Sequence, residues 1–145
     1  MKKEVLNRVK IQAVSRSANE AFLRSTAAAF VAQIDPTVDE LSDIKTAVSE
    51  AVTNCIVHAY RNTLGIITMV CEILEGNCVR IRIKDNGCGI AAIKKAMEPL
   101  YPTAPGEERA GLGFAVMESF MDHVRVSSHV GKGTTVVLEK KISSR

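Results

Sequence analysis

The chain has 145 residues, of which 46% are hydrophobic and 24% charged, and these values predict one domain spanning residues 1–145. A formal charge of +3 without dense basic runs, no Trp, two Tyr and four Phe argue against direct nucleic-acid binding. Because no apolar run reaches the roughly 18 residues of a membrane span and the four cysteines lack C-x-x-C spacing, we expect a cytoplasmic protein with reduced thiols, no membrane association and no zinc site.

The first part of the chain predicts one strand and two helices. Apolar and polar residues alternate over 5–14, the period of a strand with one covered face. A helix is expected over 17–34 and ends before Asp35-Pro36, since the residue preceding proline disfavours helix; its apolar face is expected to contain Ala21, Phe22, Ser25, Ala28, Ala29 and Ala32. A second helix should begin near 37–39 and end near Asn62, with an apolar stripe of Leu41, Ile44, Val48, Val52, Cys55 and Ala59.

The rest of the chain predicts four strands and two further helices. Residues 65–74 and 79–84 read as an antiparallel hairpin around the turn 75–77. A glycine turn at 85–89, a short helix over 91–98 and a proline-rich loop follow, then a glycine-opened helix over about 111–121 and strands near 123–130 and 134–141. A mostly antiparallel sheet covered on one face by helices is a two-layer α/β (α+β) sandwich.

One polar row lies along the second predicted helix. Glu50, Asn54 and His58 follow one another at four-residue steps and therefore share a face that borders the apolar stripe. Three such residues also fit an ordinary solvated helix face, so the row alone identifies no site.

Three glycine-containing segments could approach a phosphate or a base. Asp85-x-Gly87-x-Gly89 matches a dinucleotide fingerprint, but the half-polar hairpin strand before it is the wrong context, and a simple turn is the alternative. Gly111-Leu112-Gly113 would place free N–H groups at a helix start, where they could face phosphates. Gly131-Lys132-Gly133 lacks the serine or threonine of a P-loop and reads locally as a hairpin turn.

Taken in order, four segments resemble the N, G1, G2 and G3 boxes of the GHKL ATPase/kinase superfamily: Glu50-x-x-x-Asn54, Asp85-x-Gly87-x-Gly89, Gly111-x-Gly113 and Gly131-x-Gly133-Thr134. The resemblance spans residues 37–140 and implies the Bergerat fold, with ATP beneath a lid over about 91–110. Within the superfamily the chain is most similar to the small anti-sigma-factor serine kinases of spore-forming bacteria. We do not expect the dimerisation helix of histidine kinases or the transducer domain of Hsp90, MutL and gyrase, because 145 residues are too few to contain them.

This resemblance implies a role for each box. Glu50 would be the general base that accepts the proton of a partner's serine, and Asn54 would be a ligand of Mg²⁺. Asp85 would accept the amino hydrogen of adenine, with Gly87 and Gly89 making room for the base. The remaining nucleotide-binding residues would wrap the phosphates or, for the last, lie near the adenine or the lid: Gly111, Leu112, Gly113, Phe114 and Thr134. His58 is expected to be a packed or surface residue.

The same resemblance implies partners. Arg24 and Arg109 would belong to an overlapping surface for a sporulation sigma factor and an anti-anti-sigma factor, although each could equally be an ordinary surface arginine. A homodimer through first strands and helix-one edges is also implied. We therefore expect an ATP-dependent anti-sigma factor and protein-serine kinase with ATP and Mg²⁺ as cofactors. A nucleotide-gated binding module without phosphotransfer is the alternative, and a free-standing ATPase would fit Glu50 equally well.

Overall fold

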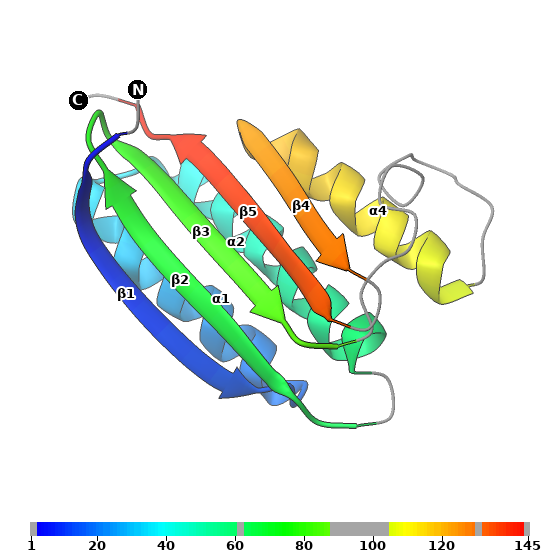
Figure 1. The fold of residues 1–145 in the computed structure, drawn as a ribbon. Coiled ribbons are helices and arrows are strands. Elements are labelled where there is room, and N and C mark those ends of the chain that lie inside the picture. The colour runs from blue at the N-terminus through cyan, green and yellow to red at the C-terminus, as the bar shows by residue number, and fades with distance from the viewer. Residues whose placement is uncertain (1–2, 61–62, 88–104, 130–131, 144–145) are drawn as a thin grey trace.

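The fold is built on one five-stranded sheet. The computed structural model describes residues 3–60, 63–87, 105–129 and 132–143, with the backbone alone described at 58, 59 and 105–112. Every strand pairing is antiparallel and the strand order is β1-β2-β3-β5-β4 (Figure 1). The strands are β1 (Val5–Val14), β2 (Ile66–Leu74), β3 (Cys78–Asp85), β4 (His123–His129) and β5 (Gly133–Lys141). The predicted strands are confirmed within one or two residues at each end.

Three α-helices cover one face of this sheet, and the other face carries none of the described helices (Figure 1). The helices are α1 (Ala18–Val31), α2 (Val38–Asn54) and α4 (Pro105–Phe120). A short 3-10 turn, Ala32–Ile34, follows α1, and a π-helical turn, Cys55–Ala59, follows α2. The predicted two-layer α+β sandwich is confirmed, while the helix expected over 91–98 lies outside the described residues.

The hydrophobic core fills the space between the sheet and α2. Alternate residues of β2 and β3, among them Met69 and Ile81, point inward and are fully buried, as the period of two requires. Ile44, Val48 and Val52 face them from α2, in agreement with the predicted stripe. Burying one such side chain stabilises the fold by about 1.5–3 kcal/mol, so this layer fixes how α2 lies on the sheet.

The face of α1 is opposite to the predicted one. The alanine-rich stripe is exposed except for Ala28, and Phe22 keeps 56% of its surface accessible. The buried side chains of α1 are Leu23, Ala27, Ala28, Phe30 and Val31. The prediction was wrong because two sets of small and apolar residues occur at helical spacing, and the larger Leu23 and Val31 bury more apolar surface than alanines do.

Two helix boundaries also differ from those expected. The last helix begins at Pro105 and not near 111, because proline is well tolerated in a first helical turn. Gly111 and Gly113 therefore lie inside α4, and the prediction that they open the helix is wrong. Regular α-helix ends at Asn54 in α2, and the π turn then carries the chain to Tyr60, where the helical region ends two residues before the predicted limit at 62.

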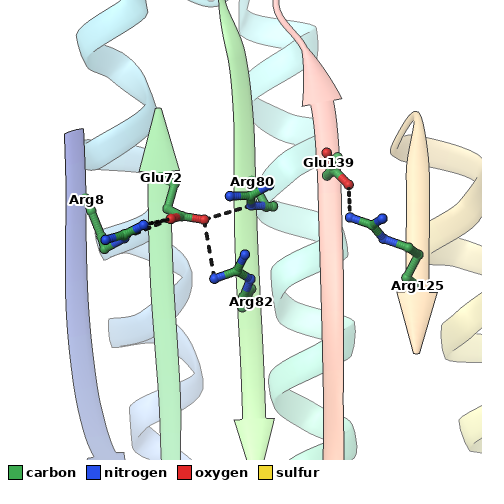
Figure 2. A network of polar contacts seen from close by, with 6 residues as sticks. All are labelled: Arg8, Glu72, Arg80, Arg82, Arg125 and Glu139. Carbon is green, nitrogen blue, oxygen red and sulfur yellow. Dashed lines mark hydrogen bonds and ion pairs between the residues drawn. The ribbon is translucent and has the colours of Figure 1, made fainter. Parts of the chain in front are cut away.

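The open face of the sheet carries a polar network, drawn in Figure 2. Glu72 on β2 is fully buried on this face because arginines from both neighbouring strands cover it. Arg8 and Arg80 donate to its carboxylate at 2.6 and 2.8 Å, and Arg82 lies 3.7 Å away. Burial alone would raise the pKa of Glu72, but the arginines outweigh burial and the pKa is lowered.

Candidate functional site

The first part of the site lies where α2 packs against α4. Glu50 and Asn54 are half-buried, one turn apart, and both face Gly113 of α4. A Cβ placed on Gly113 would lie 3.1 Å from Glu50 Oε2 and 3.4 Å from Asn54 Nδ2. The glycine thus lets α4 approach the two polar side chains closely, and the N and G2 segments meet at this point.

Asn54 has unused hydrogen-bonding capacity. Its Nδ2 atom is buried and has no hydrogen-bond partner among the described residues. A buried amide left in this state costs about 1–3 kcal/mol, so such atoms need an explanation in a folded protein. The same parts of the chain contain no cluster of three or more His, Cys, Asp or Glu side chains suited to a metal.

The second part of the site lies at the end of β3. Asp85 is 5% exposed; its Oδ1 accepts from the Gly87 N–H at 2.9 Å, and its Oδ2 accepts from the Cys55 thiol at 3.6 Å. Burial raises the pKa of Asp85, and the hydrogen bonds offset part of that rise. Because Cys55 directly follows Asn54, this contact joins the G1 segment to the end of α2.

The G3 segment joins the same cluster through the sheet. Thr134 pairs with Asp85 across β5 and β3 and is 8% exposed, and its hydroxyl lies 2.8 Å from the Ser128 hydroxyl. Gly133 has φ of 105°, and a Cβ there would lie only 2.1 Å from the Asp85 carbonyl oxygen. Only glycine fits this position. The segment is a hairpin turn between β4 and β5, as its local sequence predicts, and the same turn contains the predicted G3 glycine.

A hollow of about 300 Å³ opens beside Glu50 on the surface of α1 and α2. Its lining is almost wholly polar and consists of Arg24, Ser42, Lys45, Thr46, Ser49 and Glu50. Arg24 also donates to Glu20 at 2.9 Å, one turn away on α1. The predicted partner-binding arginine and the predicted base therefore line one surface feature.

The structure describes the remaining predicted residues unevenly. Phe114 is fully buried in the core, so its side chain cannot wrap a phosphate and only its backbone is available for that role. Gly111, Leu112 and Arg109 are described by their backbone in α4, and the side chain of His58 and all of Gly89 lie outside the described residues. These residues keep their roles as predictions.

Sequence reasoning missed two residues that contact the Asp85 segment. Cys55 was assigned only to the apolar stripe of α2, and Tyr60 received no role, although its hydroxyl accepts from the Asn86 N–H at 2.6 Å. The position of Cys55 directly after Asn54 is a sequence signal that it lies close to the candidate site. No sequence signal predicts the π turn that places Tyr60, because a π turn depends on packing and not on local propensity.

The sequence and the fold of this chain both resemble those of known ATPase domains. The family model for the histidine kinase-like ATPase domain matches residues 13–140. In the solved structures, the RsbU and RsbW domains of Rv1364c from Mycobacterium tuberculosis superpose with a TM-score of 0.70 at 20% identity, over 96% of this chain and 33% of that one. A histidine kinase domain from Erythrobacter litoralis EL346 gives a TM-score of 0.56 at 18% identity, over 85% of this chain and 61% of that one. The class of the fold is therefore a histidine kinase-like, or GHKL, ATPase domain.

Sequence relatives narrow the class. The anti-sigma F factor of Thermoanaerobacter sp. (strain X514) is 52% identical over 97% of this chain and 98% of its own length. The anti-sigma F factor of Clostridium botulinum (strain Alaska E43 / Type E3) is 55% identical over 94% of this chain and 96% of its own. The chain belongs to the family of the anti-sigma F factors, within the histidine kinase-like ATPase domains.

The comparisons confirm the predicted resemblance, the Bergerat-type fold and an ATP-binding domain. Within the described ranges, no helix has both the length and the apolar character needed to cross a membrane. Cys55, Cys71 and Cys78 are free and buried, which agrees with the expectation of reduced thiols for these three.

Proposed function

We propose that this protein is a single-domain, ATP-dependent anti-sigma factor that binds a sigma-F-like sigma factor and phosphorylates an anti-anti-sigma factor on serine. The membership of the chain in the anti-sigma F factor family supports the first activity. One structural observation carries the second: the Glu50 carboxylate lies beside Asn54 and Gly113, and the same residue lines a surface hollow. The cytoplasm, where sigma factors act, is the proposed compartment.

In the proposed reaction the γ-phosphoryl group moves from ATP to the serine oxygen of the partner. The P–O bond to the β-phosphate breaks, a new P–O bond to serine forms, and ADP leaves. Glu50 accepts the serine proton as general base, a role that requires an anionic carboxylate within reach of the hydroxyl. Gly113 supports this role because it lets the Glu50 side chain lie against α4 without a methyl group in the way.

The residues present fit Mg²⁺ bound together with a nucleotide. Mg²⁺ prefers oxygen ligands, is usually held by one or two protein groups with substrate phosphates and water, and neutralises phosphate charge when bound. Asn54 would be the protein ligand through its side-chain oxygen. Its unpaired Nδ2 atom is a hydrogen-bond donor and supports a further contact from the same amide to a phosphate oxygen of the nucleotide.

Adenine recognition is proposed for Asp85. The carboxylate is buried at the end of β3, and after the bonds from Gly87, Cys55 and the Thr134 backbone it keeps a lone pair for one more donor. The adenine amino group is such a donor. Thr134 lies next to Asp85 across the sheet and would border the same end of the nucleotide.

Partner binding is proposed for the surface that contains Arg24 and, at the start of α4, Arg109. Arg24 supports it by lining the same hollow as Glu50, so a docked segment could reach both.

We also propose a homodimer through β1 and α1. β1 is an outermost strand of the described sheet, and Phe22 on α1 is exposed; both support this proposal, because an outer strand edge favours pairing with a second strand.

The kinase proposal is tested with Glu50→Gln, which keeps the shape of the side chain and removes its charge. With labelled ATP, Mg²⁺ and the cognate anti-anti-sigma factor, single-turnover phosphorylation should fall by about 10²- to 10⁴-fold while ATP binding persists. Glu118→Gln, on an exposed part of α4, is the matched control and should keep the wild-type rate. A wild-type rate in Glu50→Gln would contradict the base assignment and favour the nucleotide-gated module.

The partner surface is tested with Arg24→Glu. The variant should bind ATP normally and bind the sigma factor more weakly, because it places a negative charge where a positive one is proposed to pair. Arg125→Glu, on the open face of the sheet, is the control for reversing an exposed arginine charge. Equal sigma-factor affinities for the two variants would remove Arg24 from the interface.

A further inference from the structure

The end of α2 supports the Asp85 segment through two side chains that the nucleotide-binding boxes do not include. Cys55 is 3% exposed, and its thiol donates to Asp85 Oδ2 at 3.6 Å. A carboxylate oxygen has no proton to give, so the thiol is the donor in this contact. Since Gly87 donates to the other oxygen, Asp85 is held at both ends of its carboxylate.

Tyr60 holds the next residue of the chain. Its hydroxyl accepts the Asn86 N–H at 2.6 Å and donates to the Ile66 carbonyl at 2.8 Å. Tyr60 as a whole is 7% exposed, and both hydrogen bonds are partly buried. Tyr60 thus links the segment after β3 to the first residue of β2, and it does so only because the π turn ends directly before it.

The chain beneath Tyr60 is shaped to receive the ring. A Cβ on Gly65 would lie 2.2 Å from the Tyr60 ring, a distance that no packed side chain tolerates. Gly65 is in turn fixed by Ser15, whose hydroxyl accepts the Gly65 N–H and whose N–H donates to the Gly65 carbonyl, both at 2.9 Å. The position of Tyr60 is therefore determined from both sides.

We infer that Cys55 and Tyr60 are positioning residues for adenine recognition, which orient the Asp85 carboxylate and the turn that follows it. This inference rests on the proposed contact of Asp85 with the adenine amino group. A carboxylate selects between an amino group and a carbonyl oxygen only when one of its lone pairs is aimed at that atom. Cys55, Gly87 and the Thr134 backbone donate to the carboxylate, and the backbone of Asn86 is anchored behind it, so the remaining lone pair has a fixed direction.

The experiment compares the dissociation constants of ATP and ITP, measured by calorimetry with Mg²⁺ present. ITP carries an oxygen where ATP carries the amino group, so the ratio of the two constants reports recognition at that position. Cys55→Ala and Tyr60→Phe should each lower the ITP/ATP ratio by about 2- to 10-fold, the change expected from one lost hydrogen bond, while ITP binding stays near the wild-type value. Cys55→Ser, which restores a donor, should recover most of the ratio.

Cys71→Ala is the matched control, because Cys71 is a fully buried thiol in the core on β2. It should lower thermal stability to a similar extent as Cys55→Ala and leave the ratio unchanged. Equal losses of ATP and ITP affinity in Cys55→Ala and Tyr60→Phe would show a general structural role and overturn the inference. If Tyr60→Phe fails to fold, the ITP/ATP ratio of Cys55→Ala still tests the inference.

Asp85→Asn separates this inference from the proposed function. If Asp85→Asn abolishes the ATP preference but Cys55→Ala and Tyr60→Phe retain it, the inference fails and the adenine contact of Asp85 stands. If the wild-type protein shows no preference, or Asp85→Asn keeps it, the Asp85 assignment fails and the inference fails with it. A lowered ratio in all three variants supports both.

Discussion

The two ends of α2 are built in opposite ways. At its start, the Thr37 hydroxyl accepts the Glu40 N–H at 3.0 Å, and the Glu40 carboxylate accepts the Thr37 N–H at 2.8 Å. Glu40 also accepts from the N–H and hydroxyl of Ser143 near the far end of the chain. At its other end, Asn54 keeps a buried unpaired amide nitrogen among the described residues, and regular helix gives way to a π turn.

This difference distinguishes residues that stabilise the fold from residues that are proposed to bind a ligand. The start of α2 satisfies the polar groups of its capping box, which stabilises the helix regardless of any partner. Its end leaves a donor without a partner among the described residues, which a bound phosphate can complete, and π turns occur frequently at functional sites. Substitutions at the start should therefore change stability alone, and substitutions at the end should change nucleotide chemistry first.

The two buried carboxylates of the sheet repeat this contrast. Glu72 is fully buried and ion-paired with arginines, which hold its pKa below the usual range despite burial (Figure 2). Asp85 is nearly as buried, but the described donors to its carboxylate, Gly87, Cys55 and Thr134, are uncharged, and burial raises its pKa. A buried carboxylate without a cationic partner among the described residues is costly, and this supports the proposal that Asp85, and not Glu72, belongs to the site.

Within the contrast between the two ends of α2, the largest effect is expected for Asn54→Ala. Loss of a ligand and a charge-assisted contact should weaken Mg²⁺-dependent ATP binding by about 10- to 100-fold, measured by titration with and without Mg²⁺. The melting temperature should hold or rise, because alanine is the better helix former by about 0.5 kcal/mol and the unpaired amide disappears. Wild-type affinity in this variant would remove Asn54 from the metal site.

Gly113→Ala should have the next largest effect. The new methyl group would lie 3.1 Å from Glu50 Oε2, so the carboxylate must shift by a few tenths of an ångström. Phosphorylation of the partner should slow by about 10-fold, since small displacements of a catalytic group are costly. Stability should rise by up to about 1 kcal/mol because alanine replaces glycine inside α4. A matching fall in activity and stability would indicate that the helix moved as a whole.

Thr37→Ala tests the other end of the helix. It should lower the free energy of unfolding by about 1 kcal/mol through loss of the cap, measured by urea denaturation. ATP affinity should not change. Thr46→Ala, the same substitution in the interior of α2, is the control and should cause no loss, because Thr46 only donates back to the Ser42 carbonyl.

Much of the fold and part of the site could be predicted from the sequence. The strands were predictable because period-two alternation over 5–14 and 79–84 reports a sheet with one covered face. The buried face of α1 could not be predicted, because small residues at helical spacing occur on two of its faces. Tertiary packing alone determines that Leu23 is buried and Phe22 is exposed. The meeting of Glu50, Asn54 and Asp85 was implied by resemblance, whereas the supports from Cys55 and Tyr60 depend on a π turn that no propensity encodes.

The smallest expected effect is a pH dependence at the start of α2. The hydrogen bond from the Thr37 N–H, with further bonds from Ser143, lowers the pKa of Glu40 from 4.5 to about 2. An acid whose pKa is lowered by folding contributes stability above its unfolded pKa and loses it as pH falls toward the folded value. The Glu40 contribution should therefore be complete above about pH 4.5 and disappear toward pH 2.

Glu40→Gln isolates this contribution from the other titrating groups. Because Glu40 is partly solvent-exposed, the screened contribution should be no more than about 1 kcal/mol. The difference in unfolding free energy between wild type and Glu40→Gln should shrink as urea titrations move from pH 5 to pH 2.5. Glu118→Gln, on an exposed part of α4, is the comparison variant for the loss of a surface carboxylate. A constant difference for Glu40→Gln would mean that its hydrogen bonds do not depend on the carboxylate charge, and the capping box would then stabilise α2 through geometry alone.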